Sequence, residues 1–206
     1  MDEQKTCYNG NIILLGSSYV GKSNMMNQFL RGQFEEVYLA TIGINCLNKL
    51  FIFDGKKVKI NYYDTAGQER YNSLNLTFLR KADGVILVYD ITSQESFRKI
   101  DFWIQELHNK SRESKVLMLV GNKTDLDNER EVSFQQGEKK ANEIGCPFME
   151  TSAKTNHNIK ECFEKASRVL YLKKSEGDSD PHDEPGSFIL DSQKEKKGGC
   201  CSDKKK

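Results

Sequence analysis

The chain has 206 residues, of which 37% are apolar and 30% are charged, a composition that suits one domain with a short appendage. Lys and Arg number 31 against 30 Asp and Glu, a net charge of +1, which argues against nucleic acid as the main partner. No run of about eighteen apolar residues is present, so we expect no membrane-spanning helix. The first ten residues lack a signal-peptide pattern, and Asp2 stands where N-myristoylation needs glycine. We therefore expect a protein kept in the cytosol.

The first half of the chain predicts a strand, a helix and a hairpin in that order. Asn11–Leu15 is an apolar strand candidate, and residues 22–30 carry apolar side chains at helical spacing. Residues 50–53 and 58–63 flank Asp54-Gly55, a strong signal for an antiparallel hairpin.

The second half alternates three further strand candidates with helical patterns. The strands are expected at residues 84–89, 116–120 and 148–150. Capping boxes that begin with Thr92 and Ser133 predict the starts of two helices. Apolar side chains expected on one face of the last helix are Ile159, Cys162, Phe163, Ala166 and Leu170.

Continuously apolar strands separated by amphipathic helices indicate an α/β fold. We expect a mostly parallel six-stranded sheet with one antiparallel edge strand and helices on both faces. The domain should cover residues 9–174, after a short disordered N-terminus at 1–8. Residues 175–206 hold six Lys and eight Asp or Glu with few apolar side chains, so we expect a disordered tail there.

Four cysteines, Cys7, Cys46, Cys146 and Cys162, are scattered along the chain without metal-ligand spacing. We expect them to be ordinary reduced thiols, as in most cytosolic proteins.

Residues 16–23 (GSSYVGKS) match the phosphate-binding pattern G-x-x-x-x-G-K-[ST] between a strand and a helix. Such a loop points backbone N–H groups at an anion, and the helix N-terminus adds a positive dipole end. Lys22 is expected to reach the β- and γ-phosphates, and the Ser23 hydroxyl is a candidate ligand for Mg²⁺. The residues expected at the phosphates are Ser18, Tyr19, Val20, Gly21, Lys22, Ser23 and Asn24.

The motif Asn122-Lys123-Thr124-Asp125 at the end of a buried strand indicates which base is bound. Guanine presents two adjacent donors that one carboxylate such as Asp125 can accept, whereas adenine does not. Lys123 can lie along the base, and Asn122 can tie neighbouring loops together. Residues Ser152, Ala153 and Lys154 follow the last strand and are expected to bring a backbone N–H to guanine O6.

A third motif, residues 64–69 (DTAGQE), follows the strand at 58–63. The Asp64 carboxylate can hold Mg²⁺ through a water molecule. Gly67 leaves its N–H open to a γ-phosphate, and Gln68 can orient the attacking water.

These blocks, in this order, resemble the Ras-like small GTPases over nearly all of residues 9–174. The chain is most similar to the Rab family, through residues 41–45 (TIGIN), 66–71 (AGQERY) and 89–93 (YDITS) and the Cys200-Cys201 pair. The resemblance implies a GTP/GDP switch that hydrolyses GTP with Mg²⁺ and regulates vesicle trafficking.

The resemblance also assigns individual residues. It implies that Thr41 binds Mg²⁺ and the γ-phosphate, and that Phe34 lies edge-on to the base. Residues around 37–46 and 65–80 would form two switch segments ordered by the γ-phosphate. No arginine finger is expected in the first switch, so intrinsic hydrolysis should be slow and stimulated by an activating protein.

The chain departs from the Rab pattern at two places. The aromatic triad that Rab effectors contact corresponds to Cys46, Tyr63 and Phe78, so two positions are changed. Tyr19 is a bulky residue in a phosphate loop where small residues are commoner.

The Cys200-Cys201 pair near the end of the tail resembles a double-prenylation signal, and two lipid chains together can anchor stably. The tripeptide Phe188–Leu190 resembles the segment by which the prenylation escort grips Rab tails, although a stray apolar tripeptide is an alternative. The implied partners are effectors, an exchange factor, an activating protein, the escort, a GDP dissociation inhibitor and a membrane surface. The implied location is the cytoplasmic face of intracellular membranes, with a soluble pool in the cytosol.

Two other functions stay open at this point. A scaffold that binds GTP without hydrolysing it would result if Tyr19 obstructed the attacking water, which Gln68 argues against. A small GTPase of another branch, such as one in nuclear transport, is disfavoured by the cysteine pair.

Overall fold

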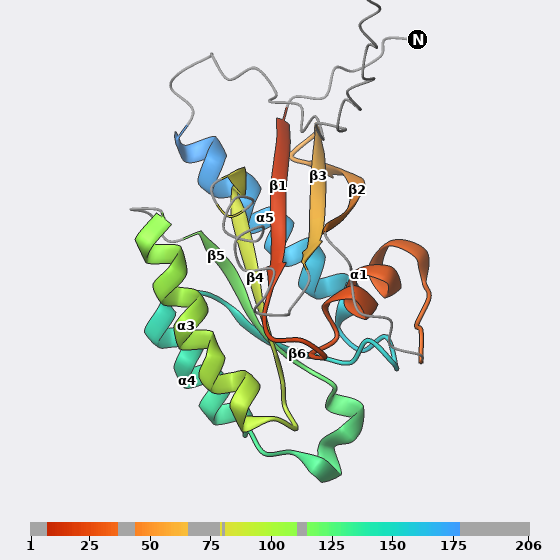
Figure 1. Cartoon of the computed structure of the whole chain (residues 1–206). Coiled ribbons are helices and arrows are strands. Elements are labelled where there is room, and N and C mark those ends of the chain that lie inside the picture. Colours follow the sequence, from red (N-terminus) through yellow and green to blue (C-terminus); the bar gives the residue numbers. More distant parts are fainter. Residues whose placement is uncertain (1–7, 37–43, 66–78, 80, 111–114, 178–206) are drawn as a thin grey trace, which may run out of the picture.

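A computed structural model describes residues 8–36, 44–65, 79, 81–110 and 115–177. Six strands form one sheet in the order β2-β3-β1-β4-β5-β6, with helices around it (Figure 1). The strands are β1 (Tyr8–Leu15), β2 (Ile44–Phe53), β3 (Lys56–Thr65), β4 (Gly84–Asp90), β5 (Val116–Asn122) and β6 (Phe148–Thr151). The helices are α1 (Lys22–Arg31), α3 (Gln94–Lys110), the short 3₁₀ helix η2 (Thr124–Glu129), α4 (Phe134–Ile144) and α5 (Ile159–Gly177). The expected α/β fold is confirmed, and most strands are longer than their apolar runs.

The strand β2 pairs antiparallel with β3, and every other neighbouring pair of strands is parallel. The hairpin turn places Asp54 and Gly55 at φ values of 52° and 76°. Two successive residues with positive φ are the backbone that a two-residue hairpin with the right twist requires. The expected hairpin is therefore confirmed, and it makes β2 an edge strand.

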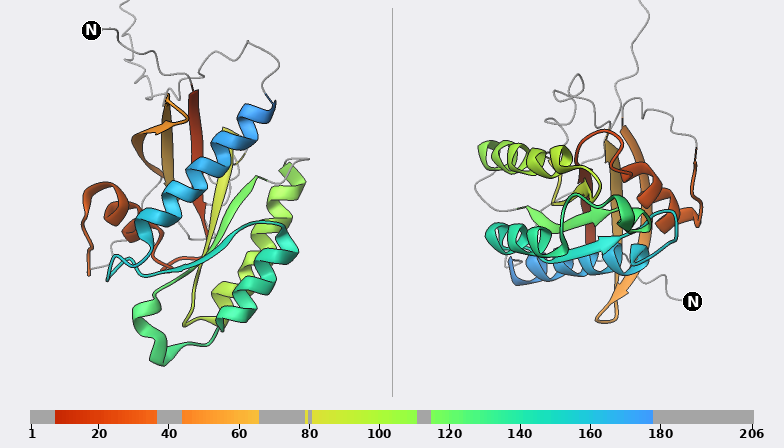
Figure 2. Two further views of the ribbon diagram at one scale, coloured as in Figure 1. Left: turned by 180° about the vertical axis from the view of Figure 1, so that it is seen from behind. Right: turned by 90° about the horizontal axis from the view of Figure 1, so that it is seen from below.

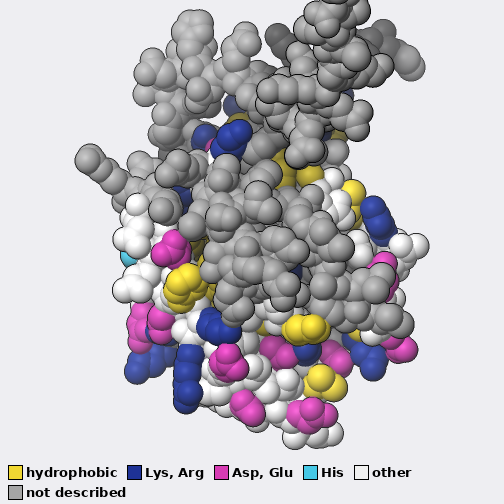
Figure 3. Space-filling view, in the orientation of Figure 1, with side chains coloured by type: hydrophobic (Ala, Val, Ile, Leu, Met, Phe, Trp, Pro, Cys, Tyr) yellow, Lys and Arg dark blue, Asp and Glu magenta, His cyan; other side chains and the backbone are white. Residues whose placement is uncertain are grey.

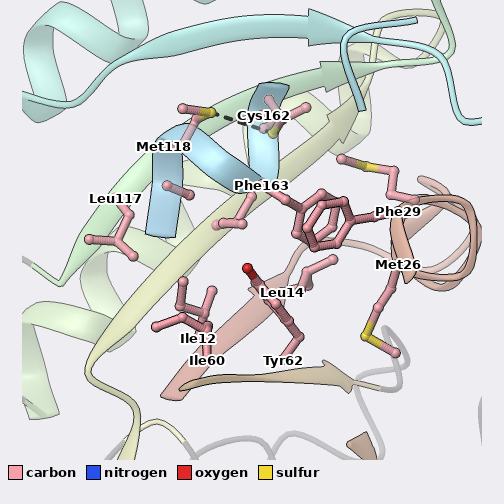
Figure 4. Close-up of a cluster of buried hydrophobic side chains, with 14 of the residues drawn as sticks. Ile12, Leu14, Met26, Phe29, Ile60, Tyr62, Leu117, Met118, Cys162 and Phe163 are labelled. Atoms are coloured by element: carbon pink, nitrogen blue, oxygen red, sulfur yellow. Dashed lines mark hydrogen bonds between the residues drawn. The ribbon is translucent and has the colours of Figure 1, made fainter. Parts of the chain in front are cut away.

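One layer of the core lies between the sheet and helices α1 and α5 (Figures 2 and 4). Phe29 of α1 stacks on Phe163 of α5 with ring centroids 4.5 Å apart, and Tyr62 of β3 meets both rings edge-on. The Tyr62 hydroxyl is 2.6 Å from Ser167 Oγ, so its polar atom has a partner in the apolar layer. The side chains predicted on the inner face of α5 are all buried: Ile159, Cys162, Phe163, Ala166 and Leu170.

The second layer lies on the other face of the sheet, beneath α3 and α4. Trp103 of α3 is buried in it. The helix α4 begins with the predicted capping box, in which Ser133 accepts from the Gln136 N–H and donates its own N–H to the Gln136 side chain. It ends at Gly145, in the left-handed conformation that glycine adopts without strain.

The start of α3 differs from the prediction by one residue. Ser93, not Thr92, has the side chain that accepts the Ser96 N–H. The Thr92 hydroxyl instead donates to the Asp90 carboxylate at 2.8 Å. Thr92 was the wrong choice because Asp90, at the end of β4, offers it a closer and charged acceptor.

No described helix has the length and apolar character needed to cross a lipid bilayer. On the lower part of the face shown in Figure 3, basic and acidic side chains are interspersed. The free cysteines within the described ranges are Cys46, Cys146 and Cys162, and burial raises the pKa of the Cys162 thiol to about 12. This thiol stays protonated and acts as a core residue.

Candidate functional site

The site is built at the carboxyl ends of the parallel strands, where the sheet order brings together loops distant in sequence. The loop 16–21 follows β1, η2 follows β5, and residues 152–158 follow β6. This is the edge at which open α/β sheets bind ligands.

The loop 16–21 curls tightly between β1 and α1. A Cβ on Gly16 would lie 2.1 Å from the Val88 carbonyl oxygen, so only glycine fits against β4 there. Gly21 has φ 95° and Tyr19 has φ 67°, so the backbone turns into the left-handed region twice within three residues. Alternating backbone of this kind turns N–H groups toward the inside of the loop, which is a geometry that binds anions. Of the other residues placed here by the sequence, Ser18 is half-buried and Val20 is buried.

Lys22 lies at the centre of this curl and is almost fully buried. Its Nζ donates to the carbonyl oxygens of Gly16 and Ser17 at 2.9 and 2.8 Å. Burial lowers the pKa of Lys22 to about 8, and the nearby Asp64 carboxylate opposes that shift. A buried ammonium with a lowered pKa is a group that gains from a bound polyanion.

Asp64 and Ser23 supply the donor set for a divalent cation. Asp64, at the end of β3, is 2% exposed, and its Oδ1 accepts no hydrogen bond within the described part of the chain, although the residue interacts with Lys22. The Thr65 hydroxyl donates to the Leu14 carbonyl at 2.8 Å, which ties the end of β3 to β1. A half-buried hydroxyl and a buried carboxylate are oxygen donors that fit Mg²⁺, which takes one or two protein oxygens and keeps several waters.

Asn122, at the end of β5, connects the loop 16–21 to the end of β6 and the segment after it. Its Nδ2 donates to the Val20 carbonyl at 2.8 Å, and its Oδ1 accepts from the Thr151 hydroxyl at 3.1 Å and from the Ala153 N–H at 3.3 Å. The side chain is buried, so each bond is shielded from water. Asn122 therefore holds the loop 16–21 and the segment after β6 in one unit, as its position in the motif predicts.

Asp125 and Lys123 are also held by the protein itself. The Ser152 hydroxyl donates to Asp125 Oδ1 at 2.5 Å, which leaves Oδ2 of the carboxylate available to a ligand. Lys123 adopts a left-handed backbone with φ 74°, and its Nζ is 2.6 Å from Asp90 Oδ2. Both side chains are thus oriented by contacts within the protein.

The remaining predicted residues take distinct places. Phe34 is half-buried and packs against the α1–α5 core layer. The Asn24 side chain exchanges two hydrogen bonds with the Glu35 backbone, so it fixes the segment after α1. Lys154 is exposed, whereas the neighbouring Ala153 N–H points at Asn122. Four predicted site residues and the cysteine pair lie outside the described residues: Thr41, Gly67, Gln68, Phe78, Cys200 and Cys201.

Three residues that position the site were missed by the sequence analysis. Asp90 holds Lys123, Thr151 bonds Asn122, and Thr65 ties β3 to β1. All three are polar and lie at the carboxyl ends of apolar strands, which is the signal that would have found them.

The comparisons with known proteins show the family of the chain. The model of the Ras family matches residues 11–172. The chain is 40% identical over 194 residues to the mouse Ras-related protein Rab-37, which covers 94% of this chain and 86% of the relative. It is 39% identical to the human Ras-related protein Rab-37 over the same length. The chain therefore belongs to the Ras family of small GTPases and, within it, to the Rab branch.

Proposed function

We propose that this Rab-like small GTPase binds GTP and GDP, hydrolyses GTP and cycles between the two states to regulate vesicle trafficking. The observation that carries the proposal is the buried Asn122 side chain, which joins the phosphate loop to the loops suited to reading a base. The loops joined by Asn122 would thus bind a base and a triphosphate together. A nucleotide is the ligand that has both parts.

Guanine is the base that the loops suit. Asp125 Oδ2 is available to accept from the N1–H and the N2 amino group, while Ser152 holds the other oxygen. Adenine would leave this carboxylate unpaired, which is strongly unfavourable in a desolvated site. The Lys123 stem and Phe34 would flank the base, and a backbone N–H of the segment 152–154 would reach guanine O6.

The hydrolysis step transfers the γ-phosphoryl group to water. Lys22 would exchange its two carbonyl partners in part for phosphate oxygens and so neutralise the charge that develops there. Ser23, Asp64 and Thr41 would hold Mg²⁺, which when bound neutralises charge on the β- and γ-phosphates. Gln68 would orient the attacking water, and the Gly67 N–H would contact the γ-phosphate.

The switch would reside in residues around 37–46 and 65–80, which γ-phosphate contacts would order and hydrolysis would release. Effectors would bind these two segments in the GTP-bound form. An exchange factor would set the rate at which GDP is replaced by GTP, and a GTPase-activating protein would set the rate of GTP hydrolysis. Cys200 and Cys201 would carry prenyl groups attached with the help of an escort, and a GDP dissociation inhibitor would hold the soluble pool.

A second candidate is a scaffold that binds GTP without hydrolysing it, because Tyr19 brings a large ring to the phosphate loop. The ring is 61% exposed, so its side chain extends away from the buried Lys22. We expect it to leave the attacking water unhindered.

Phosphate release from GTP-loaded protein separates the two candidates. In a single turnover without a partner we expect slow release, and Gln68→Leu should slow it at least about 10-fold. Gln105→Leu, on the exposed side of α3, is the matched control and should behave as the parent. Tight guanine nucleotide binding without any phosphate release would favour the scaffold, and a Gln68→Leu rate equal to the parent rate would remove Gln68 from the mechanism.

The membrane part of the proposal has its own test. An N-terminally tagged chain should stain one organelle, and Cys200→Ser with Cys201→Ser should make the signal diffuse. Diffuse staining of both chains would contradict lipid anchoring and leave a soluble switch.

A further inference from the structure

A groove of about 640 Å³ lies between the edge strand β2 and helix α5, away from the nucleotide site. Its floor includes the rings of Phe51 and Phe53, which also pack into the core. Leu172 at its side is 41% exposed and is among the exposed large apolar side chains of the described residues, whereas the side chain of Ile52 points to the other face of β2. A volume of this size accepts a few side chains of a ligand.

The β2 side of the groove is an open strand edge. In the described part of the chain, β2 pairs with β3 alone and stands at the end of the sheet. The backbone N–H and C=O groups on its outer side can therefore pair with an added extended segment. The groove combines this edge with apolar side chains, which is the arrangement that binds peptides as an extra strand.

The α5 side of the groove has an asymmetric distribution of charge. Glu161 and Glu164 lie nearer the start of the helix, and Lys165 and Arg168 follow them toward its end. Arg168 stands with its guanidinium carbon 5.6 Å from the centroid of Phe53 and donates to Asp54 at 3.1 Å. A segment that approaches from the C-terminal end of α5 meets the cations first, so an acidic segment is favoured.

The sequence directly after α5 has these properties. Residues 178–191 hold five Asp or Glu and no Lys or Arg, and they contain the tripeptide Phe188–Leu190. No proline follows Pro185 in this segment, so residues 186–191 can pair as a strand. Phe188 and Leu190 share one face of an extended segment, and Ile189 faces the other way.

The segment is long enough to reach the groove. Phe188 lies eleven positions after Gly177, a distance of up to about 36 Å when the chain is extended. The distance back along α5 from Gly177 to Arg168 is about 14 Å. The tether also gives the segment an effective concentration in the millimolar range, so weak contacts suffice.

We propose that residues 186–191 of the same chain dock in the β2–α5 groove, with Phe188 and Leu190 against its apolar side chains and the backbone paired to the edge of β2. Docking covers Leu172 and the open strand edge. It also holds residues 178–191 along the domain and shortens the free length that leads to Cys200. The proposal does not depend on nucleotide hydrolysis, and its test is independent of GTP turnover.

The test is amide hydrogen exchange of β2 in the full-length chain, measured by mass spectrometry with GDP and Mg²⁺ present. We expect Phe188→Ser with Leu190→Ser to speed exchange of β2 peptides at least about threefold. Ile189→Ser, on the opposite face of the segment, should change exchange less than twofold. A synthetic peptide of residues 178–192, added at millimolar concentration to the double variant, should restore the slow exchange.

A groove variant gives the reciprocal test. Leu172→Ser should speed exchange in the parent chain and should add nothing when combined with the double tail variant. The matched control is Phe102→Ser, because Phe102 on α3 is 43% exposed in the parent chain. This variant should not change the exchange of β2 peptides. Equal exchange in the parent and the double tail variant would overturn the proposal. Protection that grows with protein concentration would also overturn it, in favour of a second copy pairing at the β2 edge.

Discussion

The two halves of the candidate nucleotide site differ in what satisfies their polar groups. On the base side, Asn122, Lys123 and Asp125 each bond to another part of the protein, through Val20, Asp90 and Ser152. On the phosphate side, Lys22 donates to two backbone carbonyls but is buried with a lowered pKa, and the Ser17 hydroxyl forms no hydrogen bond within the described residues. The base side is organised by the fold alone, and the phosphate side has binding capacity that a polyanion and a cation would satisfy.

This difference indicates that the base side contributes mainly to selectivity and the phosphate side mainly to affinity. A base pocket oriented in advance loses little freedom when a ligand binds, so it favours selectivity. A phosphate pocket with a buried cation gains most of its electrostatic stabilisation only when the ligand arrives. Affinity should therefore be most sensitive on the phosphate side, and stability should be most sensitive at the connection between the halves.

The largest expected effect comes from removing the phosphate-side cation. Lys22→Ala should lower the affinity for GDP and GTP at least about 100-fold, since each hydrogen bond to a charged group contributes about 1.5–3 kcal/mol. Equilibrium binding of a fluorescent guanine nucleotide measures this. Lys99→Ala, on the surface of α3, is the control. A Lys22→Ala affinity within threefold of the parent would contradict the division described above.

The connection between the halves should govern stability. Asn122→Ala removes three hydrogen bonds from a buried site and should lower the free energy of unfolding by about 2–4 kcal/mol. Urea unfolding of the nucleotide-free protein measures this loss, and nucleotide dissociation should become faster as well. Asn142→Ala, on the exposed face of α4, should be nearly neutral. A neutral Asn122→Ala would mean that the two halves are held together elsewhere.

The pH dependence should identify Lys22 directly. Its pKa of about 8 in the unliganded protein should rise when phosphates bind, so binding at pH 9 should take up close to one proton. Calorimetry in two buffers of different ionisation enthalpy measures the uptake, which should be small below pH 7 and absent in Lys22→Ala. Because the folded-state pKa lies below the unfolded value, this group also makes the unliganded fold more stable as pH rises from about 8 to 10.5. Nucleotide binding without proton uptake at pH 9 would contradict this assignment.

The smallest expected effect concerns Tyr19. Tyr19→Gly relieves a left-handed backbone strain of about 1–2 kcal/mol but adds freedom to the unfolded chain, so the two effects offset each other to within about 1 kcal/mol. Thermal unfolding measures the balance, with Asn156→Gly as a control at a similar φ. Phosphate release should change less than threefold because the ring points outward. A rise in release above 10-fold would show that Tyr19 restrains hydrolysis.

Local sequence patterns were sufficient to predict many of the strands and helix starts. Apolar runs located the strands, Asp54-Gly55 located the hairpin, and the Ser133 box located the start of α4. Each of these depends on neighbours within a few residues, so one chain segment determines it. The predicted capping box at Thr92 was wrong because Asp90, which is not part of the capping pattern, accepts a hydrogen bond from the Thr92 hydroxyl.

The sequence by itself determined the α/β fold, the placement of three motifs at strand ends and the inner face of α5, since each follows from the period of a single element. Only the tertiary structure decided that Asn122 joins Val20 to Thr151, that Ser152 holds Asp125, and that a groove opens between β2 and α5. The partners in these contacts lie tens to more than a hundred residues apart. The order of strands in the sheet brings them together, and no local spacing encodes that order.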